Sequence, residues 1–495
     1  MPERELKLEA PPHFDTPDLS GLEDGLTATE PLEQRLTTTY WDTPDLRLAR
    51  WGTSLRHRSG EGWTVKLAPL MERDMMVREE LAMPGGPTRP PDGALDLLRA
   101  YVRSAELRPV ASMRTRRRAI SLLNGAGKEQ AEVVDDEVSV LDGRRIAVRF
   151  RQIEVEVKAA NANGMVDDVV ARLRAAGAGP PDPVAKHVRA MGPRSQQPPE
   201  VAPPRLDHDS SAGLVLQAAI ASPVAKLLRS DALIRLGGDP ESAHQARVAT
   251  RRLRSDLRTF APILDADWAD SLREELRWLG ELLGEVRDAD ILSERLGGQL
   301  RQISSAGGNS RRLSRQLSGR RRNARARLLT AVRGQRYIEL LERLVAAAQT
   351  PQLAEAAAQP AIEALPPLVK RTWDKLASAV RKLDKAPTDE QLHAVRIAAK
   401  RARYAAEAVA PMLGKPARRF ADVVADLQQT LGDYNDSVVT TAWLRGAVAE
   451  MEPSTAFVAG AITEKERGIA GKTKAAWPAV WKRLSRKKMH QWMEI

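Results

Sequence analysis

The sequence contains no cysteine in its 495 residues. Disulfide bonds, thiolate catalysis and cysteine-based metal sites are therefore excluded. A chain without cysteine suits the reducing cytosol, and we expect a cytoplasmic protein. The first ten residues, MPERELKLEA, are charged from residue 3 onward and do not fit the apolar region of a secretory signal.

Long apolar runs are also missing. No stretch of about 18 uninterrupted apolar residues occurs, so we expect no membrane-spanning helix. Aromatic residues make up only 4% of the chain, whereas hydrophobic residues make up 42%, which is ample for globular cores. A chain of 495 residues is too long for one ordinary core, so two or three domains are expected.

Acidic residues are too few to balance the basic ones in the C-terminal part. Residues 1–200 contain 29 Lys and Arg against 31 Asp and Glu, whereas residues 201–495 contain 48 against 34. The formal net charge of +12 therefore arises entirely after residue 200. This asymmetry indicates a polyanionic partner for the C-terminal part, such as nucleic acid, acidic lipid or a phosphate polymer.

A proline-rich stretch, GPRSQQPPEVAPPRL (192–206), predicts a linker between two domains. Before it, polar and apolar residues alternate in short segments separated by glycine and proline, which predicts antiparallel β-strands. The segments are ERELKLE, QRLTTTYWDT, TSLRHRS, WTVKLA, MRTRRRAISLL, AEVVDDEVSVL and RQIEVEVKAA. We expect a β domain over residues 1–195, with short helices near 92–104 and 164–176.

After the linker, helical periodicity predicts an all-α domain over residues 207–490. Breaks are expected at 237–240, 297–310, 350–353 and 385–389, and the stretch 308–327 is strongly basic. Two motifs repeat with nearly the same offset. HQARVATRRLR (244–254) recurs as HAVRIAAKRAR (393–403), and LGEVRDADI (283–291) recurs as LGDYNDSVV (431–439). The domain is therefore predicted to consist of two related halves, at about 207–345 and 355–490.

The first repeated motif carries one histidine and four arginines without an acidic residue. Successive residues of an α-helix turn by about 100°, which places one stripe of charge within an arc of about 80°. The stripe consists of His244, Arg247, Arg251 and Arg254 in the first copy and of His393, Arg396, Lys400 and Arg403 in the second. Like charges at these spacings repel by a few tenths of a kcal/mol per pair, which indicates that a ligand offsets them.

Two simpler explanations of the basic helices are a solvated face and arginines paired with carboxylates of neighbouring helices. The duplication of the motif and the basic excess favour a surface that holds a run of phosphates, because the planar guanidinium fork binds phosphate oxygens bidentately. Nucleic acid is a less favoured ligand, since base stacking needs exposed aromatic rings and the motifs are accompanied only by Tyr404.

The first strand of the β domain contains the pattern E-x-E-x-K. Period two places Glu3, Glu5 and Lys7 on one face, and IEVEVK repeats the pattern with Glu154, Glu156 and Lys158. Other strands add cations on one side: Arg56 and Arg58, Lys66, and Arg114, Arg116 and Arg118. An ordinary sheet with charged faces in water explains these patterns equally well. A closed barrel with the charges inside would instead gather carboxylates for a divalent cation and cations for phosphates.

The repeated pattern H-x-x-R-[VI]-x-x-[RK]-R-x-R in a helical domain resembles the CHAD domain, over about residues 205–490. The resemblance implies two pseudo-symmetric four-helix bundles with a basic surface that binds inorganic polyphosphate. The polyphosphate-binding residues that it implies are His244, Arg247, Arg251, Arg252, Arg254, His393, Arg396, Lys400, Arg401 and Arg403. The LGEVRDAD and LGDYNDSV segments also match this family, and we interpret them as structural turns.

The N-terminal part resembles the CYTH, or triphosphate tunnel metalloenzyme, superfamily over roughly residues 1–195. The motifs that carry the resemblance are E-x-E-x-K, RTRRR (114–118) and DDEV (135–138). The resemblance implies an eight-stranded antiparallel β tunnel, so the whole chain is predicted to be a multidomain α+β protein. It also implies chemistry on triphosphate compounds that depends on Mg²⁺ or Mn²⁺.

Site residues can be carried over from this superfamily by position. The catalytic residues would be Glu3, Glu5 and Lys7. The triphosphate-binding residues would be Lys7, Arg56, Arg58, Lys66, Arg114, Arg116, Arg118 and Lys186. The metal ligands would be Glu3, Glu5, Glu154 and Glu156, together with acidic residues of the strand AEVVDDEV (131–138). That strand can direct either Asp135 and Glu137 or Asp136 alone inward, and we expect Asp135 and Glu137.

Three functions are compatible with these patterns. The favoured prediction is a metal-dependent hydrolase of inorganic triphosphate, or of a related compound such as thiamine triphosphate, whose helical domain binds polyphosphate. The second is a polyphosphate-binding or targeting protein whose tunnel is only a receptor. The third is an adenylate cyclase.

Overall fold

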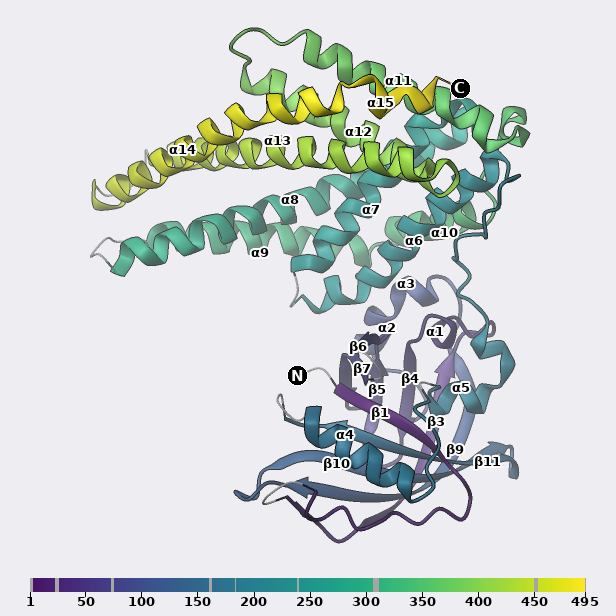
Figure 1. Ribbon diagram of the computed structural model, residues 1–495. Coiled ribbons are helices and arrows are strands. Elements are labelled where there is room, and N and C mark those ends of the chain that lie inside the picture. The colour runs from purple at the N-terminus through teal and green to yellow at the C-terminus, as the bar shows by residue number, and fades with distance from the viewer. Residues whose placement is uncertain are drawn as a thin grey trace. The chain divides into compact units, whose positions relative to one another are not determined.

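The computed structural model describes residues 3–22, 26–72, 75–159, 163–182, 184–237, 240–305, 311–448 and 453–494 (Figure 1). The chain divides into two compact units, Met1–Glu200 and Val201–Ile495. The boundary falls inside the stretch 192–206 that the sequence predicts as a linker.

The N-terminal unit is a nearly closed antiparallel β barrel. Its strands follow the order β6-β7-β1-β11-β10-β9-β3-β4-β5-β8, and the short β2 pairs with β9. Their bounds are β1 Glu3–Ala10, β2 Thr27–Ala28, β3 Leu32–Asp42, β4 Ser54–Arg58, β5 Gly62–Lys66, β6 Leu70–Glu72, β7 Met75–Arg78, β8 Glu80–Met83, β9 Arg108–Leu123, β10 Glu129–Asp142 and β11 Arg145–Val157. The described residues thus contain eleven strands where the sequence predicted eight, because several short strands complete the barrel.

Five short helices accompany the barrel: α1 Arg47–Arg50, α2 Asp92–Leu97, α3 Arg99–Val102, α4 Asn163–Ala175 and α5 Lys186–Met191. The predicted helices near 92–104 and 164–176 are therefore present. Helix α4 packs on the outer face of the barrel, where Val169 joins a core with Leu8 of β1 and Val155 of β11 (Figure 1). Since side chains alternate along a strand, the neighbours of these core residues point to the barrel interior.

The C-terminal unit is helical. Its helices are α6 Ala212–Leu236, α7 Pro240–Thr259, α8 Ala266–Ser305, α9 Arg311–Arg333, α10 Gln335–Gln349, α11 Ala361–Arg381, α12 Asp389–Leu413, α13 Lys415–Val448, α14 Pro453–Leu484 and α15 Lys487–His490. The repeated histidine–arginine motifs lie on α7 and α12, which contact each other. The second repeated motif lies on α8 and α13.

Two long helical hairpins, α8–α9 and α13–α14, extend in the same direction (Figure 1). Near their ends they share an apolar core, in which Leu296 of α8 and Leu317 of α9 meet Ile462 of α14. Beside this core, Arg295 of α8 binds the fully buried Glu466 of α14 at 2.7 Å. The two sequence halves therefore belong to one packed unit.

The sequence misplaces two features of this unit. The predicted break at 297–310 begins too early, because α8 continues through Gly297 and Gly298 to Ser305. The segments interpreted as structural turns lie within long helices, so that interpretation is wrong. Conversely, the helix end at Gly414 was missed, although its left-handed φ of 70° and the proline two residues later are a typical termination signal.

Within the described residues, one helix meets the length and composition expected of a membrane span. It is α6, and 61% of its most apolar window is buried inside the unit. A core helix of a packed bundle has the same properties, and α6 contacts α7, α10 and α11.

Candidate functional site

A cavity of about 200 Å³ lies inside the barrel. Seven cationic side chains line it: Lys7, Arg56, Arg58, Lys66, Arg78, Arg117 and Lys186. Five carboxylates lie among them: Glu61, Glu80, Glu132, Glu154 and Glu156. The two groups come from strands on different sides of the barrel and from α5, so they meet only when the sheet curls round.

Three carboxylates converge at one point of the barrel interior. Glu5 lies directly opposite Glu156 across the β1–β11 pair, and Glu154 lies two residues away on the same face. Each contributes one oxygen atom to a group in which all oxygen atoms lie within 4.8 Å of one another. Glu5 is 1% exposed and Glu154 is 6% exposed, so the cluster is largely shielded from solvent.

Cations surround this carboxylate cluster. The Nζ of Lys7 donates to Oε1 of Glu5 at 2.7 Å, and it lies 3.8 Å from Glu154. Arg78 also pairs with Glu5. Burial lowers the pKa of Lys7, although the nearby carboxylates act in the opposite direction. The interior is therefore charged but locally compensated, as buried charges require.

A second set of contacts joins β9, β10 and α5. Arg117 donates to both oxygens of Asp136, at 2.9 and 2.8 Å, and Lys186 bridges Asp136 and Glu154. Burial acts to raise the pKa of Glu154, but the charges of Lys186 and Lys7 outweigh it, so the pKa lies well below its usual value. Burial also acts to raise the pKa of Asp136, but the charge of Lys186 and the hydrogen bond from Arg117 outweigh it, so the pKa is lowered. Both carboxylates are therefore ionised at neutral pH.

His187 adds a neutral group to this interior. Its ring stacks on Tyr40, with centroids 5.2 Å apart, and burial followed by the charge of Arg78 lowers the pKa of His187 to about 3. The Nε2 atom is buried and has no hydrogen-bond partner among the described residues. The sequence did not predict a role for His187, because a lone histidine beside Lys186 carries no signal of its own.

The structure corrects the orientation of five side chains on β9 and β10. Arg114, Arg116 and Arg118 lie on the outer face of β9, so their predicted place in the tunnel is wrong, and Arg117 takes it. Asp135 likewise points outward, where Arg118 and Arg151 bind it.

Glu137 also lies on the outer face of β10, and Asp136 points inward instead. The inference from the alternation of Val134 and Val138 failed because β10 buries both of its faces, so apolar residues do not mark one side. The side chain of Glu3, predicted as catalytic and metal-binding, lies outside the described residues. The predicted residues Lys7, Arg56, Arg58, Lys66 and Lys186 do line the cavity, together with Arg78, which the sequence analysis missed.

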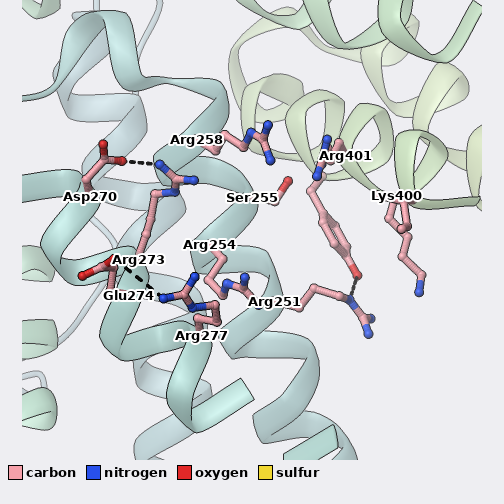
Figure 2. Close-up of a pocket in the computed structure, with 12 residues that line it drawn as sticks. Arg251, Arg254, Ser255, Arg258, Asp270, Arg273, Glu274, Arg277, Lys400 and Arg401 are labelled. Carbon is pink, nitrogen blue, oxygen red and sulfur yellow. Dashed lines mark hydrogen bonds and ion pairs between the residues drawn. The ribbon is translucent and has the colours of Figure 1, made fainter. Parts of the chain in front are cut away.

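A second, larger cavity of about 530 Å³ lies in the helical unit. Arg251, Arg254 and Arg258 of α7 face Lys400 and Arg401 of α12 across it (Figure 2). Arg273 and Arg277 of α8 also line it, and they pair with Asp270 and Glu274 (Figure 2). We call this cavity the helical groove. The sequence repeat predicted its α7 and α12 cations but not Arg258 or those from α8.

Tyr404 sits at the centre of the groove's arginines. Its hydroxyl accepts a hydrogen bond of 2.9 Å from Nε of Arg251. Arg252 and Arg403 approach its ring, and both also bind Glu407, at 2.8 and 2.6 Å. For these two arginines the simpler explanation, pairing with a carboxylate of the bundle, holds in the structure.

Four cations of the groove have no such partner. Arg254, Arg258, Lys400 and Arg401 make no hydrogen bond or ion pair within the part of the chain that the structure describes. Burial, followed by the charges of Arg396 and Arg251, lowers the pKa of Lys400 to about 7. The groove thus holds positive charge that the bundle itself does not neutralise.

The second repeated motif positions the arginines of the first. Gly284 of α8 lies against the guanidinium of Arg247, and Gly432 of α13 lies in the same way against Arg396, since a Cβ at either glycine would be 3.7 Å from the arginine Nε. The adjacent Asp288 binds Arg247 at 3.4 Å. Burial lowers the pKa of both arginines, although Asp288 acts to raise the pKa of Arg247 and Asp436 acts to raise that of Arg396.

The two histidines of the repeat differ. His393 is exposed and its Nδ1 lies 2.9 Å from Oδ1 of Asn435, whereas Nδ1 of His244 is buried without a partner among the described residues. Burial, followed by the charge of Arg287, lowers the pKa of His244. Neither histidine is among the residues that line the groove.

Comparison with known families accounts for both units. The CYTH domain model matches residues 1–183, and the CHAD domain model matches residues 218–445. The chain carries a CYTH domain followed by a CHAD domain. CYTH domains are typically triphosphate tunnel metalloenzymes, and CHAD domains are linked to polyphosphate.

An uncharacterised protein of Mycobacterium tuberculosis is 27% identical over 506 residues, which cover 95% of this chain and 94% of the relative. Among solved structures, PptA from Streptomyces chartreusis is 25% identical, covers 55% of this chain and 100% of its own, and has a TM-score of 0.47. The CHAD domain from the plant Ricinus communis is 23% identical, covers 59% of this chain and 95% of its own, and has a TM-score of 0.43.

The carboxylates of the CYTH domain fit a divalent metal ion. Mg²⁺ and Mn²⁺ prefer oxygen ligands, and Glu5, Glu154 and Glu156 present three carboxylates at one point. The low pKa of Glu154 supports this fit, because a metal ligand must be deprotonated. The cluster also lies beside the cations of the cavity, so a metal held there would be adjacent to a bound phosphate chain.

Proposed function

We propose that the CYTH domain hydrolyses inorganic triphosphate, or a closely related linear triphosphate, in a reaction that depends on Mg²⁺ or Mn²⁺. The observation that carries this proposal is the convergence of Glu5, Glu154 and Glu156 at the wall of a cavity that seven cations line. A triphosphate is a short chain of negative charge, and it needs cations along its length together with a metal at the reacting end.

The residues of the cavity divide this work. Lys66 and Arg56, on β5 and β4, bind Glu80 in the free protein at 2.8 and 3.4 Å, and they are positioned to exchange that carboxylate for phosphate oxygens. Lys186 and Arg117 hold Asp136 and Glu154 in place, which keeps the carboxylate cluster ordered. The cluster would hold the metal, which supplies charge neutralisation and a water of lowered pKa. Attack of water on the terminal phosphorus breaks a phosphoanhydride bond and yields orthophosphate and pyrophosphate.

The size and lining of the cavity favour a linear phosphate over a nucleotide. At about 200 Å³ it is smaller than the 300–1,000 Å³ usual for drug-sized ligands. Its walls are mainly charged, and the two rings that line it, Tyr40 and His187, are already stacked on each other. A nucleobase therefore has no free ring to stack on within the described lining.

We further propose that the helical groove binds inorganic polyphosphate. Its four unpartnered cations and the fork geometry of arginine suit a long chain of phosphates. The described lining of the groove includes only two carboxylates, Asp270 and Glu274, and within the described residues three carboxylates converge only in the tunnel. It is therefore suited to binding rather than hydrolysis.

The hydrolase proposal is tested by measuring phosphate release from inorganic triphosphate by the full chain, with Mg²⁺, with Mn²⁺ and with chelator. Glu156→Gln should lower the rate by about 100-fold or more, because it removes one ligand of the metal. Asp168→Asn, on the exposed face of α4, is the matched control and should retain the rate. Absence of release from protein that still binds triphosphate would indicate a receptor, and cyclic nucleotide formed from ATP would indicate a cyclase.

The polyphosphate proposal is tested by titrating the full chain with long-chain polyphosphate in the presence of chelator. The double variant Arg254→Gln/Arg401→Gln should weaken binding at least about 10-fold, because two charge-assisted contacts are lost. Arg418→Gln, which changes an exposed arginine of α13 outside the groove lining, is the control. Equal binding by both variants would contradict the proposed site.

A further inference from the structure

The outer face of the barrel carries a second concentration of arginine, away from α4. Two cross-strand rows run over β3, β9, β10 and β11. The first row is Arg35, Arg116, Glu137 and Arg151, and the second is Thr37, Arg114, Ser139 and Arg149. Residues directly opposite each other on neighbouring strands share a face. These eight side chains therefore project from the same side of the sheet.

All eight residues line one open cavity of about 750 Å³, and the rest of its described lining is Pro12, Leu36, Thr115, Val138 and Phe150. This cavity is separate from the tunnel. Arg116 faces it, whereas the next residue, Arg117, faces the tunnel and binds Asp136. No residue lines both cavities in the described part of the chain. We call this cavity the outer arginine site.

The charges of the outer arginine site are not balanced within the fold. Arg116 pairs with the half-exposed Glu33 at 2.8 Å, and Arg151 pairs with Asp135 at 2.6 Å. Arg35, Arg114 and Arg149 make no hydrogen bond or ion pair with any residue that the structure describes, and all three are exposed. Glu137 is the one carboxylate in the described lining, and Arg118 lies 3.7 Å from it.

This arrangement costs the isolated barrel free energy. Arg35 lies directly opposite Arg116, and like charges in that relation destabilise a sheet. A bound anion removes the repulsion and supplies acceptors to the guanidinium groups. The hydroxyls of Thr37 and Ser139, in the same row as Arg114, offer further donors to the oxygens of an anion.

The spacing of the free arginines indicates an extended anion. Arg35 and Arg149 are on β3 and β11, with β9 and β10 between them. Three inter-strand spacings correspond to roughly 14 Å, so a chain of several phosphates contacts both more readily than a single orthophosphate does. Phe150 is the one aromatic residue in the described lining, and its ring packs with Val138 and is covered by the guanidinium of Arg189, 5.7 Å from the ring centroid, so it is not free to stack on a nucleobase.

We propose that the outer arginine site binds a linear inorganic phosphate chain of several units, independently of both the tunnel and the helical groove. In this proposal Arg35, Arg114 and Arg149 are the principal contacts. The site lacks a carboxylate cluster among its described residues and does not hydrolyse the chain. It gives the CYTH domain a contact with longer phosphate chains that its small tunnel cannot enclose.

The test is arginine footprinting of the full chain. The protein is treated with phenylglyoxal in chelator, with and without a phosphate chain of about ten units, and modification of each arginine is followed by mass spectrometry. Chelator prevents hydrolysis, and the readout at individual residues separates this site from the others. Arg35, Arg114 and Arg149 should be modified several-fold more slowly with the chain present. Arg174, exposed on α4 and without a partner among the described residues, should be unaffected.

Two variants complete the test. Arg114→Gln/Arg149→Gln should abolish protection of Arg35, whereas Arg174→Gln should not, and both should release phosphate from inorganic triphosphate at the rate of the unaltered protein. Equal protection of Arg174, or no protection at the three arginines, would overturn the proposal even if the tunnel is an active hydrolase. Stronger protection by a single-stranded RNA of matched charge would overturn the choice of ligand. Loss of hydrolysis alone, with protection retained, would count against the proposed tunnel function only.

Discussion

The tunnel and the helical groove present their cationic side chains in two different ways. In the tunnel nearly every cation has a carboxylate partner, as in the pairs of Lys7 with Glu5 and of Arg117 with Asp136. In the groove, Arg254, Arg258 and Arg401 have no carboxylate partner among the described residues. The tunnel cavity measures about 200 Å³ and has buried charged residues such as Lys7 and Glu154 in its wall, whereas the groove measures about 530 Å³ and its cations are partly or fully exposed.

This difference in pairing is the reason why we propose hydrolysis for the tunnel and binding alone for the groove. Buried cations must be paired, since an unpaired buried charge costs several kcal/mol. The same carboxylates that pair with the tunnel cations are the ones that can hold a metal, so burial and catalytic potential arise together. The groove cations Arg254, Lys400 and Arg401 are partly exposed, so they keep contact with water and remain available to a long polyanion. In the functions that we propose, both units bind linear phosphates, one unit for hydrolysis and the other for binding alone.

The largest effect is expected on the rate of triphosphate hydrolysis, when a tunnel arginine of β9 is replaced. Arg117 and Arg118 are neighbours in sequence but face opposite sides of β9. Arg117→Gln should lower the rate of triphosphate hydrolysis by about 100-fold, because it removes a buried cation and leaves Asp136 with one partner fewer. Arg118→Gln should change the rate less than about two-fold. Initial rates at saturating metal measure both, and equal losses would contradict the face assignment.

A smaller effect is expected from salt, which should weaken ligand binding more in the groove than in the tunnel. Binding of polyphosphate to the open groove should weaken at least about 10-fold when NaCl is raised from about 50 to about 300 mM, because salt screens exposed charges and replaces released counterions. The KM for triphosphate in the shielded tunnel should rise only about two- to three-fold over the same range. Titration in chelator measures how polyphosphate binding depends on salt, and steady-state kinetics measure how the KM for triphosphate depends on it. An equal salt dependence of the two quantities would contradict the proposed difference between the groove and the tunnel.

The smallest effect concerns Lys400. Its pKa of about 7 means that it is mostly protonated below neutral pH and mostly neutral above it. Polyphosphate binding should therefore weaken several-fold as the pH rises from about 6 to about 8.5, with Arg251, Arg396 and Asp436 remaining charged. In Lys400→Arg the side chain stays cationic, so this dependence should disappear. If polyphosphate binding by Lys400→Arg kept the pH dependence of the unaltered protein, a group other than Lys400 would be responsible for it.

The sequence predicted the two kinds of unit and much of the residue content of both sites. Alternation gave the long strands, and the repeated histidine–arginine motifs predicted the groove residues Arg251, Arg254, Lys400 and Arg401. These signals are local, since one strand or one helix carries each of them. The short strands and the long extensions of α8 and α13 carried weaker signals.

The parts that the sequence did not give depend on packing between elements. Arg117 and Asp136 could not be assigned to the interior, because β10 buries apolar residues on both faces and its pattern is symmetric. Arg78 and His187 join the tunnel only through barrel curvature and the position of α5. Gly284 and Gly432 suggested turns, whereas each allows close approach of an arginine from a neighbouring helix. Such roles belong to pairs of elements, and a single sequence does not show which elements meet.

The most direct test of the division of labour measures both activities on the same preparations. Triphosphate hydrolysis with Mg²⁺ or Mn²⁺ and polyphosphate binding in chelator are determined for the full chain, for Glu156→Gln and for Arg254→Gln/Arg401→Gln. We predict that the first variant loses hydrolysis and keeps binding, and that the second keeps hydrolysis and binds polyphosphate at least about 10-fold more weakly. Loss of both activities in either variant, with the fold intact by thermal melting, would contradict the account of two independent sites.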